Sequence, residues 1–195
     1  RKDVLEVEEQ FGYERSRQLW TFAEQAKQEV RDRVEKHNIP CDLQKGQLVG
    51  VHRRGYLGWA QDIADALTDR YDYPFCMALD AEQTREYVKT DDYLEGFYDP
   101  EAMTLHPLNY ALGVANAAAR AGVRVFENSR VTGYTRTDPA VVSTATGSVK
   151  AAHVVLGCNG YLGDLEPRSA GQIMPINNFM LATERLDADR ARALI

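Results

Sequence analysis

Residues 107–157 constrain the fold of this 195-residue chain most, because a predicted helix and two apolar strands enclose a predicted meander there. Pro107 suits the first position of a helix and Gly122 suits the end of one, so the pattern predicts a helix over residues 107–121. The apolar positions of this helix are Leu108, Ala111, Leu112, Ala115, Ala118 and Ala119. Such an alanine-rich helix can be covered closely by neighbouring elements.

Apolar runs on both sides of the meander predict two further strands. Residues 123–126 follow the helix directly, and residues 153–157 have the continuous apolar run of a strand that is buried on both faces. Between them lie the segments of a predicted antiparallel meander, residues 131–136, 141–144 and 148–151. We expect the two flanking strands to be parallel members of one sheet, with the meander as their crossover.

The N-terminal half of the chain combines predicted helices with short strands. Leu19, Phe22, Ala26, Val30 and Val34 recur every three or four residues, which predicts a long amphipathic helix over residues 13–37. The pattern further predicts a hairpin over residues 41–52 that turns at Gly46, a helix over 59–70, a short helix that Asp80 caps, and a strand over 94–98. Together these elements predict an α/β fold with an α+β part.

Composition excludes several classes of protein. The chain has 44% hydrophobic residues with only 7 Pro and 14 Gly, so it can build a core and is not a disordered or low-complexity chain. Lys and Arg number 23 against 29 Asp and Glu, a net charge of -6 without a basic stripe, which argues against nucleic acid or a membrane surface as a partner. No apolar run is long enough to predict a membrane span.

The cysteines favour a reducing compartment. Cys41, Cys76 and Cys158 are far apart and odd in number, and they form no CxxC pair. They show no metal-ligand spacing with the histidines, so we expect reduced thiols, no metal site and a cytoplasmic protein. Because the chain opens with Arg1 rather than Met, we expect it to be an internal piece of a longer protein.

Two features of the sequence can carry chemistry. The loop over residues 157–163 follows a predicted buried strand, where open α/β sheets bind ligands; it is not a GxGxxG motif, and a plain loop is the alternative. His106 precedes a predicted helix, where the helix dipole disfavours the charged imidazole and leaves a neutral donor or acceptor; the alternative is a capping residue. No activating group is next to Cys158, which favours a small buried thiol over a nucleophile.

The ordered set of motifs resembles one known family. The stretches that carry the resemblance are Leu105-His106-Pro107-Leu108, Gly122-Val123 through Val131, Val154-Val155-Leu156 through Leu162, and Met174-Pro175-Ile176 ahead of Ala182 through Leu186. As a set they resemble the FAD-dependent oxidoreductases of the D-amino-acid oxidase and glycine oxidase superfamily, and within it the gamma-glutamylputrescine oxidoreductase-like branch. The opening helix with Arg17, Leu19 and Trp20 extends this similarity over nearly the whole chain.

The resemblance implies a division into domains and a cofactor site. It implies an incomplete FAD-binding Rossmann-type (glutathione-reductase-like) domain, formed by residues 1–40 and 101–172, and an antiparallel substrate-domain sheet, formed by residues 41–100 and 173–195. By resemblance, the residues that contact the ADP part of FAD are Val131, Cys158, Asn159 and Gly160. His106 is the candidate catalytic residue. The GxGxxG unit of such proteins is not present in this sequence.

The resemblance also implies a reaction. Such proteins oxidise a small-molecule amine by hydride transfer to FAD, giving an imine and, with molecular oxygen, hydrogen peroxide. The protein must then align a C–H bond with the flavin and keep the amine neutral. The alternatives are a flavin dehydrogenase that uses another electron acceptor, and a non-catalytic α+β domain if the chain acts alone.

Overall fold

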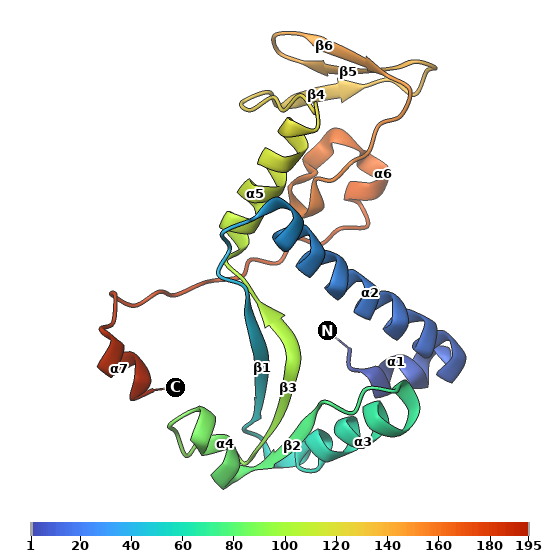
Figure 1. Cartoon of the computed structure of the whole chain (residues 1–195). Coiled ribbons are helices and arrows are strands. Elements are labelled where there is room, and N and C mark those ends of the chain that lie inside the picture. The colour runs from blue at the N-terminus through green and yellow to red at the C-terminus, as the bar shows by residue number, and fades with distance from the viewer. Residues whose placement is uncertain (1, 195) are drawn as a thin grey trace. The chain divides into compact units, whose positions relative to one another are not determined.

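The computed structural model describes residues 2–194, and these residues form two compact units (Figure 1). The first unit contains residues 2–123 and 185–194, and the second contains residues 124–184. Each unit is described by itself. The four-segment division that the family resemblance implies stays a prediction.

The first unit is built on a three-stranded antiparallel sheet in the order β1-β3-β2. Its strands are β1 (Gln44–Val51), β2 (Met77–Asp80) and β3 (Glu95–Thr104). The central strand β3 pairs with both neighbours, so that Tyr98 lies opposite Leu48 on one side and Met77 on the other. The predicted strand over residues 94–98 is therefore confirmed, although β3 continues six residues further, to Thr104.

The predicted hairpin over residues 41–52 is wrong. Gly46 does not reverse the chain but lies inside β1, where the register against β3 shifts between Lys45 and Gln47. Its φ of +94° and the approach of Tyr98 Oη to within 2.6 Å of an added Cβ explain why glycine stands there. A glycine that permits a bulge and one that permits a turn look the same in a sequence.

Helices cover this sheet and extend from it. They are α1 (Val4–Phe11), α2 (Tyr13–His37), α3 (Trp59–Tyr71), α4 (Ala81–Tyr87), α5 (Pro107–Arg120) and α7 (Ala188–Arg192), with the short 3-10 helix η1 (Arg54–Tyr56). The predicted helices over 13–37, 59–70 and 107–121 are confirmed. Asp80 caps α4 as predicted, because its carboxylate accepts the backbone N–H of Gln83 at 2.8 Å while the Gln83 side chain accepts the N–H of Asp80.

The core of the first unit lies where α3 packs against the sheet. Ile63, Leu67, Tyr71 and Tyr73 form its buried cluster. Helix α2 adds Trp20, whose ring contacts both buried tyrosines edge to face. This packing holds α2 and α3 together around a small aromatic core.

The second unit is a three-stranded antiparallel meander followed by short helical turns. Its elements are β4 (Val131–Tyr134), β5 (Ala140–Thr144), β6 (Ser148–Ala151), η2 (Asn159–Tyr161), η3 (Gly163–Leu165) and α6 (Pro167–Ala170). The strand order is β4-β5-β6, and the backbone N–H of Thr144 donates to the carbonyl of Gly147 in the turn between β5 and β6. The predicted meander is confirmed.

The two strands predicted on either side of the meander are not formed. Residues 123–126 and 153–157 have no regular secondary structure, and every strand pair within residues 2–194 is antiparallel. Val155, expected at the centre of a buried strand, is 92% exposed. The physical reason is that a strand buried on both faces needs a hydrogen-bonded neighbour and covering helices, and none of the described residues supplies them for this segment.

No helix within residues 2–194 is long and apolar enough to cross a membrane. The described part of the chain also contains no cluster of His, Cys, Asp or Glu side chains that could hold a metal ion.

Candidate cofactor site

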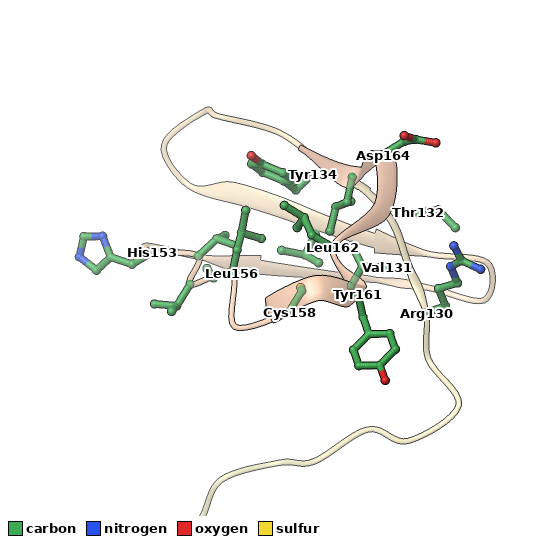
Figure 2. Close-up of a pocket in the computed structure, with 15 residues that line it drawn as sticks. Arg130, Val131, Thr132, Tyr134, His153, Leu156, Cys158, Tyr161, Leu162 and Asp164 are labelled. Atoms are coloured by element: carbon green, nitrogen blue, oxygen red, sulfur yellow. The ribbon is translucent and has the colours of Figure 1, made fainter. Parts of the chain in front are cut away.

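A cavity of about 760 Å³ lies in the second unit, between the meander and the segment that follows β6 (Figure 2). It is lined by Arg130, Val131, Thr132, Tyr134, Val142, Ala151, His153, Val154, Val155, Leu156, Cys158, Tyr161, Leu162, Asp164 and Leu165. Two of the predicted FAD-binding residues, Val131 and Cys158, thus line the same cavity although 27 positions separate them in the chain.

The strand β4 provides one wall. Because β4 is an edge strand in the order β4-β5-β6, one side of its backbone has no strand partner among the described residues. Val131 starts this strand, opposite Thr144 of β5. An apolar side chain next to free backbone groups suits the flat base of a nucleotide, which needs both a surface to pack on and hydrogen bonds at its edge.

The loop after β6 provides the opposite wall. Cys158 borders the cavity, and Asn159 and Gly160 follow it in η2. Neither residue lines the cavity within the described structure, so their contact with FAD remains a prediction. Asn159 has a left-handed φ of 49°, and this turn brings Leu162 back to the cavity.

A charged cluster fixes the short helices against the sheet. Glu166, which is 8% exposed, accepts hydrogen bonds from the hydroxyl of Tyr134 and, at 2.6 Å, from the guanidinium of Arg136. The hydrogen bond from Tyr134, and next the one from Arg136, hold the pKa of Glu166 below its usual range. The hydrogen bond between Tyr134 and Glu166 also raises the pKa of Tyr134. Glu166 is the residue before α6, so this cluster ties the start of α6 to Tyr134 at the end of β4.

The cavity has the chemistry expected of a site for the adenosine end of FAD. Val131, Val142, Val154 and Leu156 offer apolar surface. Residues 153–157 make no backbone hydrogen bond to any other described residue, so their N–H and carbonyl groups are free to bind a ligand. These features fit the base and ribose of the cofactor. The binding of its pyrophosphate requires the N-terminus of a helix behind a glycine-rich turn, which this sequence does not contain.

His106, the candidate catalytic residue, is the N-cap residue of α5 in the first unit. Its Nδ1 accepts the backbone N–H of Asn109 at 3.3 Å, and the backbone N–H of His106 donates to the carbonyl of Cys41 at 2.7 Å. The structure therefore shows His106 as a helix-capping residue, which was the alternative to a chemical role. The imidazole is exposed, and Nε2 makes no hydrogen bond to the described residues, so a role in catalysis stays a prediction.

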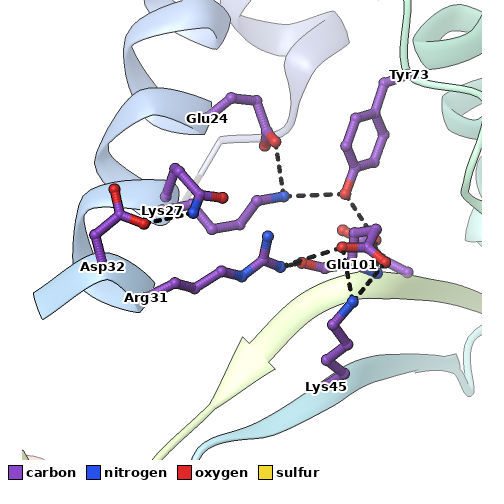
Figure 3. Close-up of polar contacts among 9 residues, drawn as sticks. Glu24, Lys27, Arg31, Asp32, Lys45, Tyr73 and Glu101 are labelled. Carbon is purple, nitrogen blue, oxygen red and sulfur yellow. Dashed lines mark hydrogen bonds and ion pairs between the residues drawn. The ribbon is translucent and has the colours of Figure 1, made fainter. Parts of the chain in front are cut away.

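Sequence reasoning missed a polar network in the first unit, which Figure 3 shows. Lys27 Nζ lies 2.8 Å from Glu24 and donates to Tyr73 Oη at 3.0 Å; the Tyr73 hydroxyl in turn donates to Asp99 Oδ1 at 2.9 Å. Burial and then this bond to Asp99 raise the pKa of Tyr73. Lys27 and Tyr73 are 46 positions apart, and no local pattern could have paired them.

The fold is shared with solved oxidoreductases. L-proline dehydrogenase from P. horikoshii is similar with a TM-score of 0.61 and 18% identity, over 78% of this chain and 41% of that chain. Glycine oxidase from Geobacillus kaustophilus is similar with a TM-score of 0.54 and 20% identity, over 79% and 41%. These similarities show that the chain shares the fold of these solved enzymes.

The chain belongs to the FAD dependent oxidoreductase family, whose model matches residues 7–194. Gamma-glutamylputrescine oxidoreductase of Escherichia coli (strain K12) is 35% identical over 195 residues, all of this chain and 46% of that protein. Probable oxidoreductase OrdL of Rhizobium meliloti is 34% identical over 179 residues, 91% of this chain and 42% of that protein. The chain thus spans less than half the length of these relatives.

These comparisons confirm the family resemblance, the α/β fold class and FAD as the cofactor. They show that the chain belongs to a family of FAD-dependent oxidoreductases, and the activity of the whole protein is a proposal. The residues that contact FAD, the catalytic residue and the substrate are proposals.

Proposed function

We propose that the protein to which this chain belongs oxidises a small-molecule amine with FAD, yielding an imine, and that molecular oxygen takes up the electrons as hydrogen peroxide. The observation that carries the proposal is the 35% identity to gamma-glutamylputrescine oxidoreductase over all 195 residues. An amine of modest size with a glutamyl or similar acidic group is therefore the substrate that we expect. We also propose a cytoplasmic location, which the three well-separated cysteines support.

In this proposal the cavity of the second unit holds the adenosine end of FAD. When bound, FAD supplies the hydride acceptor that no amino-acid side chain can replace. The chain's own contribution there is to bind and orient: Val131 packs on the base, and the free backbone groups of residues 153–157 hydrogen-bond its edges and the ribose. Cys158, Asn159 and Gly160 form the loop that closes over this end.

We propose that the first unit contributes to substrate binding. Its antiparallel sheet is the element that the resemblance assigns to the substrate side, and His106 lies 2 residues beyond the end of β3. Because Nδ1 of His106 accepts a hydrogen bond from Asn109, the outward Nε2 is the nitrogen that would meet an amine. A neutral imidazole then carries its proton on Nε2, so His106 would donate a hydrogen bond to the amine nitrogen and favour the neutral amine over its ammonium form before hydride transfer.

Anaerobic stopped-flow spectroscopy of the flavin-loaded protein tests the proposal. A panel of amines and a panel of 2-hydroxy acids are mixed one compound at a time with the oxidised protein, and bleaching of the flavin absorbance is followed. We expect bleaching by at least one amine and by no hydroxy acid. Bleaching by hydroxy acids alone would contradict the proposed amine chemistry.

Two further arms refine the result. Admission of oxygen after reduction should restore the flavin absorbance and release hydrogen peroxide; if only an added quinone restores it, the protein is a dehydrogenase. His106→Ala should slow reduction by the amine while the FAD content stays the same, because Pro107 and the alanines still hold α5. An unchanged rate would leave His106 as a cap alone.

A further inference from the structure

The first unit contains a second cavity, of about 370 Å³, that the proposed function does not use. Its lining includes Val4, Val7, Trp20, Trp59, Ile63 and Asp99. The lining comes from α1, α2 and α3, from strands β1 and β3, and from Lys2 and Asp3 just before α1. Both tryptophans of the chain line this one cavity.

The aromatic walls of this cavity are held in fixed orientations. Trp20 contacts the rings of Tyr71 and Tyr73 edge to face, with centroid distances of 5.8 and 5.2 Å. Trp59 packs on Phe97 at 5.8 Å, and its Nε1 donates to Asp3 Oδ2 at 2.8 Å. These contacts fix the rings of Trp20 and Trp59, and the ring surface that lines the cavity stays available to a ligand.

A carboxylate with a free oxygen accompanies these rings. Asp99 Oδ1 accepts the Tyr73 hydroxyl and the backbone N–H of Glu101, both at 2.9 Å. Asp99 Oδ2 accepts no hydrogen bond from any of residues 2–194. Two hydrogen bonds to Oδ1 fix the orientation of the Asp99 carboxylate, so Oδ2 also has a fixed position and can accept a hydrogen bond from a ligand.

The nearby cations are engaged elsewhere. Lys27 pairs with Glu24 and donates to Tyr73 (Figure 3), and Lys2 donates to Gln10. Neither amine therefore makes a hydrogen bond to Asp99. Two carboxylates, Asp3 and Asp99, and one cation, Lys2, line this cavity, so its lining has a net charge of −1.

We propose that this cavity binds a small organic ammonium ion. The apolar body of the ion would fill the space between Val4, Val7 and Ile63, its positive centre would lie against Trp20 and Trp59, and Asp99 Oδ2 would face the charge. Aromatic faces attract a cation through the ring quadrupole, most strongly for tryptophan, and desolvation inside a cavity strengthens this attraction. The proposal does not depend on the proposed amine oxidation.

The test uses fluorine NMR of the flavin-loaded protein labelled with 5-fluorotryptophan. Among the tryptophan resonances of the labelled protein, Trp20→Phe and Trp59→Phe identify those of Trp20 and Trp59. The probe is phenyltrimethylammonium, which cannot form an imine, and its uncharged counterpart is tert-butylbenzene. We expect the ammonium probe to shift both resonances in a saturable way and tert-butylbenzene to bind about tenfold more weakly, because it lacks the charge.

Asp99→Asn tests the role of the carboxylate charge at the cavity. Asp69→Asn, which removes a carboxylate charge outside the cavity, is the matched control. Asparagine keeps an oxygen that can accept the bonds from Tyr73 and Glu101, so the fold is retained while the charge is removed. Asp69 is exposed on α3 and does not line the cavity. We expect Asp99→Asn to weaken the ammonium probe about tenfold and Asp69→Asn to have no effect. No shift of either resonance, equal binding of the two probes, or equal binding to the parent and Asp99→Asn would overturn the proposal.

Discussion

Helix α5 contacts the end of α2 through a glycine that leaves no room for a methyl group. A Cβ added at Gly113 would lie 2.3 Å from Cγ2 of Ile39, 2.9 Å from Cγ1 and 3.0 Å from Cβ. Ile39 is 5% exposed, so its side chain has little room to move away. Gly113→Ala therefore tests whether α5 packs on Ile39 as closely as described.

The expected sign of this change is opposite to the usual one. Alanine in place of glycine inside a helix ordinarily stabilises by about 1 kcal/mol. Carbon atoms in contact prefer separations of about 3.5–4.0 Å, so the new methyl group overlaps Ile39 by more than ~1 Å. Overpacking of a filled site costs about 1–3 kcal/mol. The balance predicts that Gly113→Ala lowers the free energy of unfolding by about 1 kcal/mol.

Urea unfolding followed by circular dichroism measures the difference. Asn116→Ala, at an exposed position of the same helix, is the control and should stabilise by about 0.5 kcal/mol. In an Ile39→Ala background the two Cγ atoms are gone, so Gly113→Ala should there be neutral or stabilising, with a coupling of at least ~1 kcal/mol. A Gly113→Ala variant as stable as the Asn116→Ala control would refute the close packing.

Three further predictions concern single side chains. Glu166→Gln should lower the stability of the second unit at neutral pH and make that stability depend less on pH in acid. Tyr134 and Arg136 lower the pKa of Glu166 in the folded protein, so the stabilisation by this carboxylate is present above the ordinary glutamate pKa of about 4.3 and is lost as the pH falls through the lower folded value. Thermal melts of the parent and the variant at pH 3 to 7 measure the difference. Asp80→Ala removes the cap of α4 and should cost about 1 kcal/mol in urea unfolding, whereas Asp80→Asn should cost much less. Cys76 should react with iodoacetamide at pH 8 far more slowly than free cysteine, because burial raises the pKa of its thiol to about 12; mass spectrometry of the native protein checks this, and full reaction within minutes would contradict it.

Local patterns predicted the helices of this chain well. The spacing of Leu19, Phe22 and Val30 predicted the extent of α2, and Asp80 with Gln83 predicted the start of α4, because each signal lies within a few residues. The same spacing did not predict burial, since Leu19 and Phe22 are exposed in the structure. Strands in the second half were predicted less well. The apolar run over residues 153–157 indicates that the segment favours extended, buried backbone. Whether it becomes a strand depends on a pairing strand from elsewhere in the chain.

The candidate sites depend on contacts that no local pattern contains. Val131 and Cys158 were connected through family resemblance alone, and the cavity that both line appears only in three dimensions. No pattern in the sequence connected Asp99 with the two tryptophans. Their common cavity arises from the packing of α1, α2 and α3 on the sheet, which a sequence does not display.

The central claim is that the cavity between β4 and the loop after β6 holds the adenosine end of FAD, and the chemical accessibility of Cys158 tests it most directly. The flavin-depleted full-length protein is treated with N-ethylmaleimide, alone and with ADP, FAD or riboflavin, and the labelled cysteines are quantified by mass spectrometry. Cys41, which is buried, and Cys76 serve as internal references. We predict that ADP and FAD protect Cys158 and that riboflavin, which lacks the adenosine end, does not. Equal labelling of Cys158 with and without ADP would contradict the assignment of this cavity to the cofactor.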